Sequence, residues 1–307
     1  MVAIDTSLER NEYAAGETVK GTLTISEDKD FRVQSFELSV TGEERIEISE
    51  EKSFENRTIT SQESNVFFSK DLSQFLNSIG TKVKDDDNYN MLQVPGGITK
   101  VPFEFTIPDD ALESYEGKYA MTIYKIEAAA NMPRRLDIGK SLSFNVFNQK
   151  RNNMKFDRAI REEIKEKTNS GIRLELEGEK NTFSPGEIIR GKIIIEDSKI
   201  SSKIRKAELI LGAIEFVQAQ GKKKRTEIFP NYKEKIKGKI EWNKDDNSSN
   251  IPFETHIPKD IKRSYLGKYY EYYWLLEAKV DIPWSDDLYD RTIIQIVRVK
   301  RNSSSVM

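Results

Sequence analysis

The sequence predicts an all-β protein of two tandem β-sandwich domains, with a short helix in the first domain and a linker helix between the two. Three observations support this prediction. Apolar residues alternate with polar ones at a period of two, turn residues separate these runs, and one pattern is written twice along the chain. We expect an N-terminal sandwich over 1–150, a linker helix over 151–170, a C-terminal sandwich over 171–300 and a flexible tail over 301–307.

Composition excludes several classes of protein. The 307 residues are 37% hydrophobic and 33% charged, which suits a soluble protein with two cores. No Cys is present, which excludes disulfides, thiolate zinc sites and cysteine nucleophiles. The N-terminus has neither a basic region nor an apolar run, and no window approaches 18 apolar residues. We therefore expect a cytoplasmic protein, with a peripheral position at the inner membrane face as an alternative.

The net charge of −2 hides an asymmetry between the two halves. Residues 1–150 hold 17 Lys and Arg against 26 Asp and Glu, a net charge of −9, whereas residues 151–307 hold 32 against 25, a net charge of +7. Such a chain can orient a partner or favour docking of its own halves. Drift in surface composition is the equally open alternative.

Strand patterns follow one another through the first half. Alternation places Val19, Gly21, Leu23 and Ile25 on one face, and two further runs repeat it at 36–41 and 103–107. Two segments follow a helical spacing instead. The first is 66–80, with apolar residues at Phe68, Leu72, Phe75, Leu76 and Ile79 before Gly80; the second is 153–168, with Phe156, Ile160 and Ile164. The second segment is the predicted linker helix.

The second half repeats the first. The run GETVKGTLTI at 16–25 recurs as GEIIRGKIII at 186–195, 170 residues later. Two more runs recur 150 residues later: VPFEFTIPDD at 101–110 as IPFETHIPKD, and SYEGKY at 114–119 as SYLGKY. At this second offset Tyr124 corresponds to Trp274. The constant offsets indicate a tandem duplication with about twenty extra residues in the first copy.

These repeated motifs resemble the arrestin-fold superfamily, and within it the α-arrestins most closely. The resemblance depends on G-E-x-V-x-G-x-L-x-I, then P-F-x-F-x-I-P, then S-x-x-G-K-Y, in that order and twice. It implies two immunoglobulin-like sandwiches joined by a hinge, and a non-enzymatic adaptor or scaffold that binds cytoplasmic segments of membrane proteins, or trafficking and signalling partners. A sorting role related to the arrestin-fold subunit of retromer is an alternative. The Lys-, Ile- and Glu-rich usage without Cys suits a microbial or archaeal member.

Two family features are missing from this sequence. Adjacent lysines on the first strand, which sense phosphate in some arrestins, are replaced by a segment with Arg10 and three acidic residues, and no Pro-Pro pair exists for recruitment of a ubiquitin ligase. A phosphorylated segment would also meet a domain of net charge −9. Receptor desensitisation and ligase recruitment are therefore disfavoured, while general scaffolding remains.

We predict two places of contact with a partner. An extended peptide can add as a strand to an open sheet edge, for which the segment 2–8 with Ile4, Thr6 and Leu8 is the preferred candidate and the groove between the domains the second. The basic run Lys222, Lys223, Lys224 and Arg225 is expected near a hairpin tip. It can contact anionic lipid or an acidic partner, or it can be an ordinary solvated hairpin. A self-assembling structural protein is the third class considered.

Catalytic, cofactor and metal sites are not predicted. His256 replaces Thr106 of the first copy on the polar face of a strand, where a surface imidazole is expected. Adjacent acids such as Glu43 and Glu44 point to opposite faces of a strand and cannot form an acid–base pair. The aromatic run at 269–274 alternates, so we expect about half of it to be buried and no platform for nucleic acid.

Overall fold

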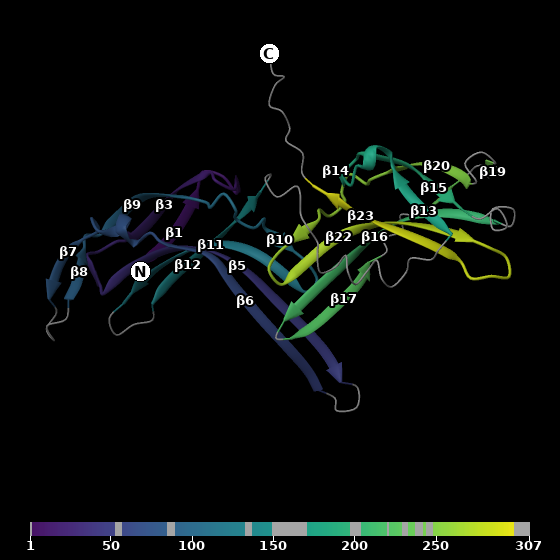
Figure 1. Cartoon of the computed structure of the whole chain (residues 1–307). Helices are drawn as coiled ribbons and strands as arrows, with labels where there is room; N and C mark the ends of the chain where they lie inside the picture. The colour runs from purple at the N-terminus through teal and green to yellow at the C-terminus, as the bar shows by residue number, and fades with distance from the viewer. Residues whose placement is uncertain are drawn as a thin grey trace, which may run out of the picture. The chain divides into compact units, whose positions relative to one another are not determined.

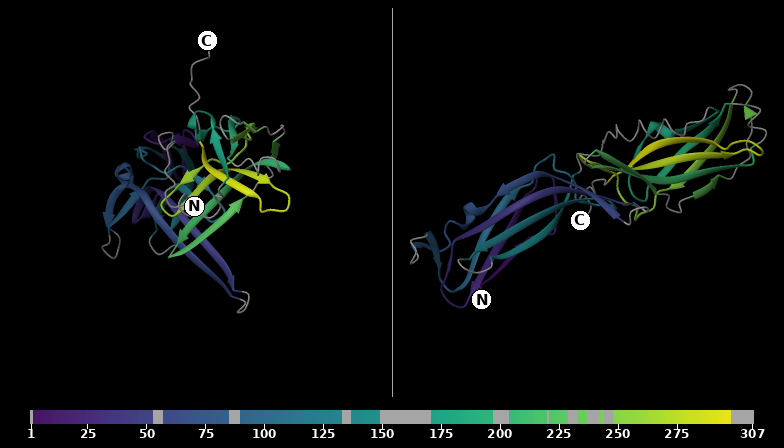
Figure 2. Two further views of the ribbon diagram at one scale, coloured as in Figure 1. Left: turned by 45° about the vertical axis from the view of Figure 1, so that its right-hand side comes forward. Right: turned by 90° about the horizontal axis from the view of Figure 1, so that it is seen from below.

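The computed structural model describes residues 2–52, 57–84, 90–132, 137–148, 171–196, 204–219, 221–228, 233–236, 242–243 and 248–297. These residues are mostly in strands, which confirms the all-β prediction (Figure 1). The chain divides into two compact units, Met1–Asn148 and Gln149–Met307. Figure 2 shows that each unit is built of layered strands; most of them pair antiparallel, and one strand pair in each unit is parallel. The predicted linker helix and the tail lie outside the described residues.

Unit 1, Met1–Asn148, contains two main sheets and a small third one. The three-stranded sheet has the order β1-β3-β9, with β1 Ala3–Leu8, β3 Thr18–Glu27 and β9 Gly97–Thr106. The larger sheet has the order β2-β12-β11-β5-β6, with β10 also paired to β11. Its strands are β2 Glu12–Ala14, β5 Ser35–Lys52, β6 Arg57–Asp71, β10 Tyr115–Glu116, β11 Ala120–Asn131 and β12 Ile138–Phe147. The small sheet joins β4 Phe31–Val33, β7 Thr81–Lys84 and β8 Asn90–Val94.

Unit 2, Gln149–Met307, repeats this plan with two sheets. One has the order β13-β15-β20-β19, with β13 Ile172–Leu176, β15 Ile188–Ile195, β19 Trp242–Asn243 and β20 Ser248–His256. The other has the order β14-β23-β22-β16-β17, with β18 paired to β16 and β21 to β22. Its strands are β14 Thr182–Phe183, β16 Lys206–Ala219, β17 Lys222–Ile228, β18 Lys233–Ile236, β21 Tyr265–Leu266, β22 Tyr270–Asp281 and β23 Leu288–Ile296. A short 3-10 helix, η3 Glu177–Glu179, follows β13.

The repeated G-E-x-x-x-G run has the same structural role in both units. Gly16 and Gly186 have φ angles of 81° and 82°, a left-handed conformation that favours glycine. Gly21 lies opposite Phe103, whose ring occupies the space that a Cβ would need, and Gly191 lies in the same way against Phe253. The motif therefore combines a tight turn with close packing of the paired P-F strand.

The repeated S-x-x-G-K-Y run and the aromatic residue after it also form equivalent contacts. Tyr124 Oη donates a hydrogen bond to the carbonyl of Leu112 at 2.6 Å, and Trp274 Nε1 donates to the carbonyl of Lys262 at 2.7 Å. Both aromatic side chains are buried, at 0% and 3% exposed. Burying an aromatic ring is strongly stabilising when its polar atom finds a partner. These two residues therefore anchor the two cores.

The predicted alternation is confirmed in unit 1. On β3 the side chains of Val19, Leu23 and Ile25 are buried, and on β11 every second residue from Ala120 to Ala130 is buried. The buried residues join in one hydrophobic cluster between the two main sheets. This core holds β1 over β12, which fixes the position of the first candidate site.

Two expectations about local structure are corrected. The helix predicted over 66–80 is a single 3-10 turn, η1 Ser73–Leu76, and Phe68 belongs to strand β6. Leu72, Leu76 and Ile79 are nevertheless buried. Their spacing in the sequence therefore reflects the burial of these side chains and does not indicate an α-helix. The aromatic run at 269–274 was expected to be half-buried, but Tyr270, Tyr272, Tyr273 and Trp274 are all buried, because both faces of β22 are covered.

Candidate functional site

Strand β1 lies at the edge of its sheet, with β3 as its partner in the part of the chain that the structure describes. The N–H of Glu9 donates to the carbonyl of Lys20 at 3.2 Å, which fixes the phase of the β1–β3 ladder. In an antiparallel pair the hydrogen-bonded positions alternate, so the main-chain groups of Ile4, Thr6 and Leu8 point away from β3. These three residues of the sequence-predicted site therefore provide the open edge.

The side chains of these residues point into the domain. Ile4 and Thr6 are only 8% and 5% exposed, and Leu8 is half-buried against the hydrophobic cluster. Ala3, Asp5 and Ser7 carry the exposed side chains of β1. A partner at this edge would therefore meet the main chain of Ile4, Thr6 and Leu8, and the side chains of their neighbours. The alternation in the sequence did not show which residues of β1 offer main-chain groups and which offer side chains, because this depends on the register of β1 on β3.

Thr6 has an additional unusual feature. Its Oγ1 atom is buried and has no hydrogen-bond partner. Among the described residues, no acceptor meets its outward main-chain N–H either. Buried hydroxyl and amide groups are normally hydrogen-bonded, so an exception calls for an explanation.

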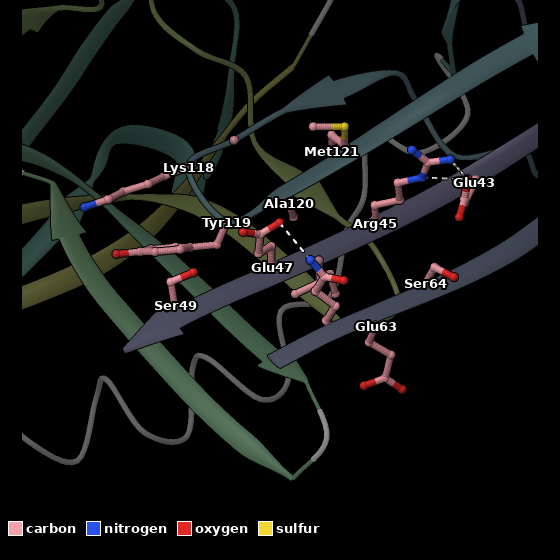
Figure 3. A pocket seen from close by; sticks show the side chains of 13 residues that line it. Glu43, Arg45, Glu47, Ser49, Glu63, Ser64, Lys118, Tyr119, Ala120 and Met121 are labelled. Carbon is pink, nitrogen blue, oxygen red and sulfur yellow. Dashed lines mark hydrogen bonds and ion pairs between the residues drawn. The ribbon is translucent and has the colours of Figure 1, made fainter. Parts of the chain in front are cut away.

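A second candidate is a hollow of about 760 Å³ on the face of the larger sheet of unit 1 that points away from the core. Figure 3 shows how it is built: Glu43, Arg45, Glu47 and Ser49 come from β5, whereas Lys118 and Tyr119 come from the connection that leads into β11. The complete lining is Glu43, Arg45, Ile46, Glu47, Ser49, Gln62, Glu63, Ser64, Gly117, Lys118, Tyr119, Ala120 and Met121.

The polar groups of this hollow are largely paired with one another. Arg45 donates to Glu43 Oε2 at 2.7 Å, and this hydrogen bond raises the pKa of the guanidinium. Gln62 Nε2 donates to Glu47 Oε2 at 3.2 Å. The lining contains no His that could act as a catalytic base. Met121, at 41% exposed, provides an apolar contact beside these groups. Sequence reasoning did not single out this hollow, whose residues come from three segments.

The other predicted residues are placed as follows. Residues 222–225 begin strand β17, directly after the turn that contains Gly221, and they pair with 216–219 of β16. Their side chains lie outside the description. His256 is exposed on β20, as predicted.

The described residues include no cluster of three or more His, Asp or Glu side chains that could hold a metal ion. They also include no helix that is long and apolar enough to cross a membrane.

A comparison with protein families agrees with this fold. Residues 2–153 match the family described as "Arrestin (or S-antigen), N-terminal domain". Among solved structures, one that is similar is the crystal structure of Spo0M, a sporulation control protein from Bacillus subtilis. It has 12% sequence identity and a TM-score of 0.32, over 95% of this chain and 90% of that chain. No curated protein matches the sequence.

Proposed function

Because this chain belongs to the arrestin-fold superfamily, we propose that it is a non-enzymatic adaptor that captures an extended segment of a partner protein as an extra strand on β1. Arrestin-fold domains in general support an adaptor or scaffold role. The observation that supports strand addition on β1 is its open edge, where the main-chain groups of Ile4, Thr6 and Leu8 point outward.

Strand addition uses main-chain hydrogen bonds for affinity and side chains at alternate positions for specificity. On β1 the side chains available for specificity are those of Ala3, Asp5 and Ser7, which are small or acidic. The half of the chain that contains them, 1–150, has a net charge of −9. The partner segment is therefore expected to be neutral or basic, and a segment rich in phosphate or carboxylate is disfavoured by charge. A cytoplasmic segment of a membrane protein is the partner class that the family suggests.

The substitution Thr6→Pro tests this proposal. Proline removes the outward N–H of residue 6, while the β1–β3 ladder, which uses the neighbouring residues, keeps its hydrogen bonds. Tagged wild-type and variant chains are used to purify partners from the source cell, and the segment of each partner that binds is then titrated against both. We expect at least about a tenfold loss of affinity, the equivalent of one or two main-chain hydrogen bonds.

Thr6→Val is the matched control, because it changes the same buried side chain and keeps the N–H. It should bind as the wild type does. Thermal unfolding of Thr6→Pro verifies that the domain folds, and Ile4→Pro removes an equivalent outward N–H if it does not. A partner segment that binds both proline variants with wild-type affinity would show that the edge of β1 is not the site.

A further inference from the structure

The two units contain equivalent edge strands, β1 and β13. Thr6 lies opposite Leu23 on β3, and Leu174 lies opposite Ile193 on β15, 170 residues further along the chain. The N–H of Glu196 donates to the carbonyl of Gly171 at 3.2 Å, which sets the same ladder phase as in unit 1. The main-chain N–H of Leu174 therefore points outward from its sheet, just as that of Thr6 does.

In unit 2 this outward group is occupied by a side chain. The N–H of Leu174 donates to Asp290 Oδ2 at 2.6 Å, and Asp290 Oδ1 accepts the N–H of Arg291 at 2.9 Å. Asp290 belongs to β23, a strand of the other sheet. Hydrogen bonds that involve an ionised acceptor are stronger than neutral ones. The carboxylate thus fills the position at which an added strand would place its own carbonyl.

Asp290 is half-buried, and this burial raises the pKa of its carboxyl, although the N–H groups of Leu174 and Arg291 and the charge of Arg173 oppose the shift. Keeping the carboxyl of Asp290 ionised in this half-buried position costs free energy, because the charge is partly removed from water.

Unit 1 has no such carboxylate at the equivalent position. Asp290 lies opposite Ala278 on β22, and 150 residues earlier Lys140 lies opposite Ala128 on β11. Lys140 is exposed, and an ammonium group donates hydrogen bonds but cannot accept one. Its side chain therefore cannot cap the outward N–H of Thr6.

We propose that Asp290 is a specificity-determining residue that closes the edge of β13, so that of the two equivalent edges, β1 and β13, only β1 accepts an added strand. This proposal rests on the proposed function in one respect only, namely that β1 is the edge that captures a partner segment. Closing an exposed edge with an inward-pointing charge is a known means of preventing unwanted strand pairing. The occupant that Asp290 excludes is a second copy of this chain.

The sequence of β13 is suited to pairing with itself. In a two-fold antiparallel pair centred on Leu174, Arg173 of one copy lies opposite Glu175 of the other, and Ile172 lies opposite Leu176. The outward N–H and carbonyl of the two Leu174 residues would face each other in such a pair. Opening this edge should therefore produce a dimer.

Amide hydrogen exchange of the wild-type chain provides the first test and needs no partner. After correction for sequence, the N–H of Leu174 should exchange at least about tenfold more slowly than that of Thr6, because within the described part of the chain only Leu174 has an acceptor. Equal rates would overturn the proposal.

Substitutions of Asp290 provide the second test. In dilute solution Asp290→Ala should speed exchange at Leu174 by about tenfold, and sedimentation equilibrium should show a dimer as the concentration rises. Adding Arg173→Glu should abolish that dimer, because the introduced glutamate would then lie opposite Glu175 of the other copy, and like charges repel. Asp290→Asn keeps an acceptor oxygen and should remain monomeric, and Lys140→Ala should change neither measurement. Unchanged exchange at Leu174, or a folded Asp290→Ala chain that stays monomeric, would overturn the proposal.

The reciprocal substitution is Lys140→Asp. A carboxylate at this position should slow exchange of the Thr6 N–H and weaken capture of a partner segment by unit 1. The exchange and sedimentation results do not depend on any partner, so the Asp290 proposal can fail or succeed separately from strand addition on β1. Another result would also count against the proposal. In it, Thr6→Pro abolishes partner capture, whereas Lys140→Asp slows exchange of the Thr6 N–H but leaves partner capture unchanged.

Discussion

Units 1 and 2 share a frame and differ at their edges. In both units an aromatic residue on the central strand donates a hydrogen bond to the carbonyl at the equivalent position, Tyr124 to that of Leu112 and Trp274 to that of Lys262. At the equivalent edges, Leu174 is capped by a carboxylate, while Thr6 has no acceptor among the described residues. Contacts that hold the core have therefore survived the duplication, whereas the edges have diverged. This is the pattern expected when one copy keeps a binding edge and the other is closed.

The central strands differ as well. Every second residue of β11 is buried, whereas both faces of β22 are buried over most of its length. Tyr273 and Leu275 of β22 join Ile214 of β16 in a small cluster separate from the main core, at positions where β11 has Ile123 and Lys125. The outer face of unit 1 is thus largely polar, whereas that of unit 2 combines a small apolar cluster with buried acidic side chains such as Glu271 and Glu277. The duplicated strand has been adapted to two different environments.

The largest effect expected from the shared frame is that of Tyr124→Ala. Tyr124 is fully buried, and its ring centroid lies 5.5 Å from that of Phe144 and 5.6 Å from that of Phe67. Truncating a buried aromatic residue should lower the stability of unit 1 by about 3–5 kcal/mol. All three Trp residues of the chain lie in unit 2, so urea unfolding followed by Trp fluorescence reports on unit 2, and far-UV circular dichroism reports on both.

We expect a new low-urea transition in circular dichroism and an unchanged Trp transition. Tyr124→Phe is the control, because it removes only the hydrogen bond to Leu112 and should cost about 1 kcal/mol. A Trp transition that moves with Tyr124→Ala would contradict the view that the two cores are separate.

The sequence was sufficient for the fold and only partly sufficient for the site. Period-two alternation and the two constant offsets predict the sandwiches, because the burial of one sheet face and the repeated turns are local properties of the sequence. The open edge of β1 was predicted, but the inward orientation of the Ile4 and Thr6 side chains was not, because register depends on a distant partner strand. The Asp290 cap connects residues 116 apart in the sequence. Only the repeat offset, which pairs Asp290 with Lys140, contains a signal for it.

Acid should weaken both units in the same way through the repeated glutamate of the G-E motif. The N–H of Ala14 and the guanidinium of Arg10 hold the pKa of Glu17 below its ordinary value of 4.5. Burial opposes the shift at Glu187, yet its ion pair with Lys180 and the N–H of Ser184 lower that pKa too. A carboxyl whose pKa is lowered by folding stabilises the protein above its unfolded pKa, and this contribution is lost as the pH falls through the folded pKa.

Glu17→Gln and Glu187→Gln should therefore each destabilise by about 1 kcal/mol at pH 7. The difference from the wild type should shrink as the pH falls below the ordinary pKa of 4.5, and it should disappear once the pH has passed through the lowered pKa of the folded state, where the wild-type carboxyl is protonated. Urea unfolding between pH 7 and 3 measures this dependence. Glu104→Gln, which removes an exposed charge from β9, is the matched control. A difference that persists unchanged at pH 3 would show that the carboxylate charge is not the stabilising feature.

The smallest predicted effect distinguishes the contribution of the Thr6 side chain to stability from the role of the β1 main chain in binding. The Oγ1 atom of Thr6 is buried without a hydrogen-bond partner, and the equivalent residue of unit 2 is the apolar Leu174. Thr6→Val removes the unpartnered hydroxyl at nearly constant volume, and should stabilise unit 1 by about 1 kcal/mol in urea unfolding. Ser7→Ala, on the exposed side of the same strand, should change stability by less than about 0.5 kcal/mol. A Thr6→Val chain no more stable than the wild type would mean that the hydroxyl is satisfied in solution. If it is more stable and still captures its partner, then the edge acts through the main chain, because the side chain can be exchanged for that of an ordinary core residue without loss of binding.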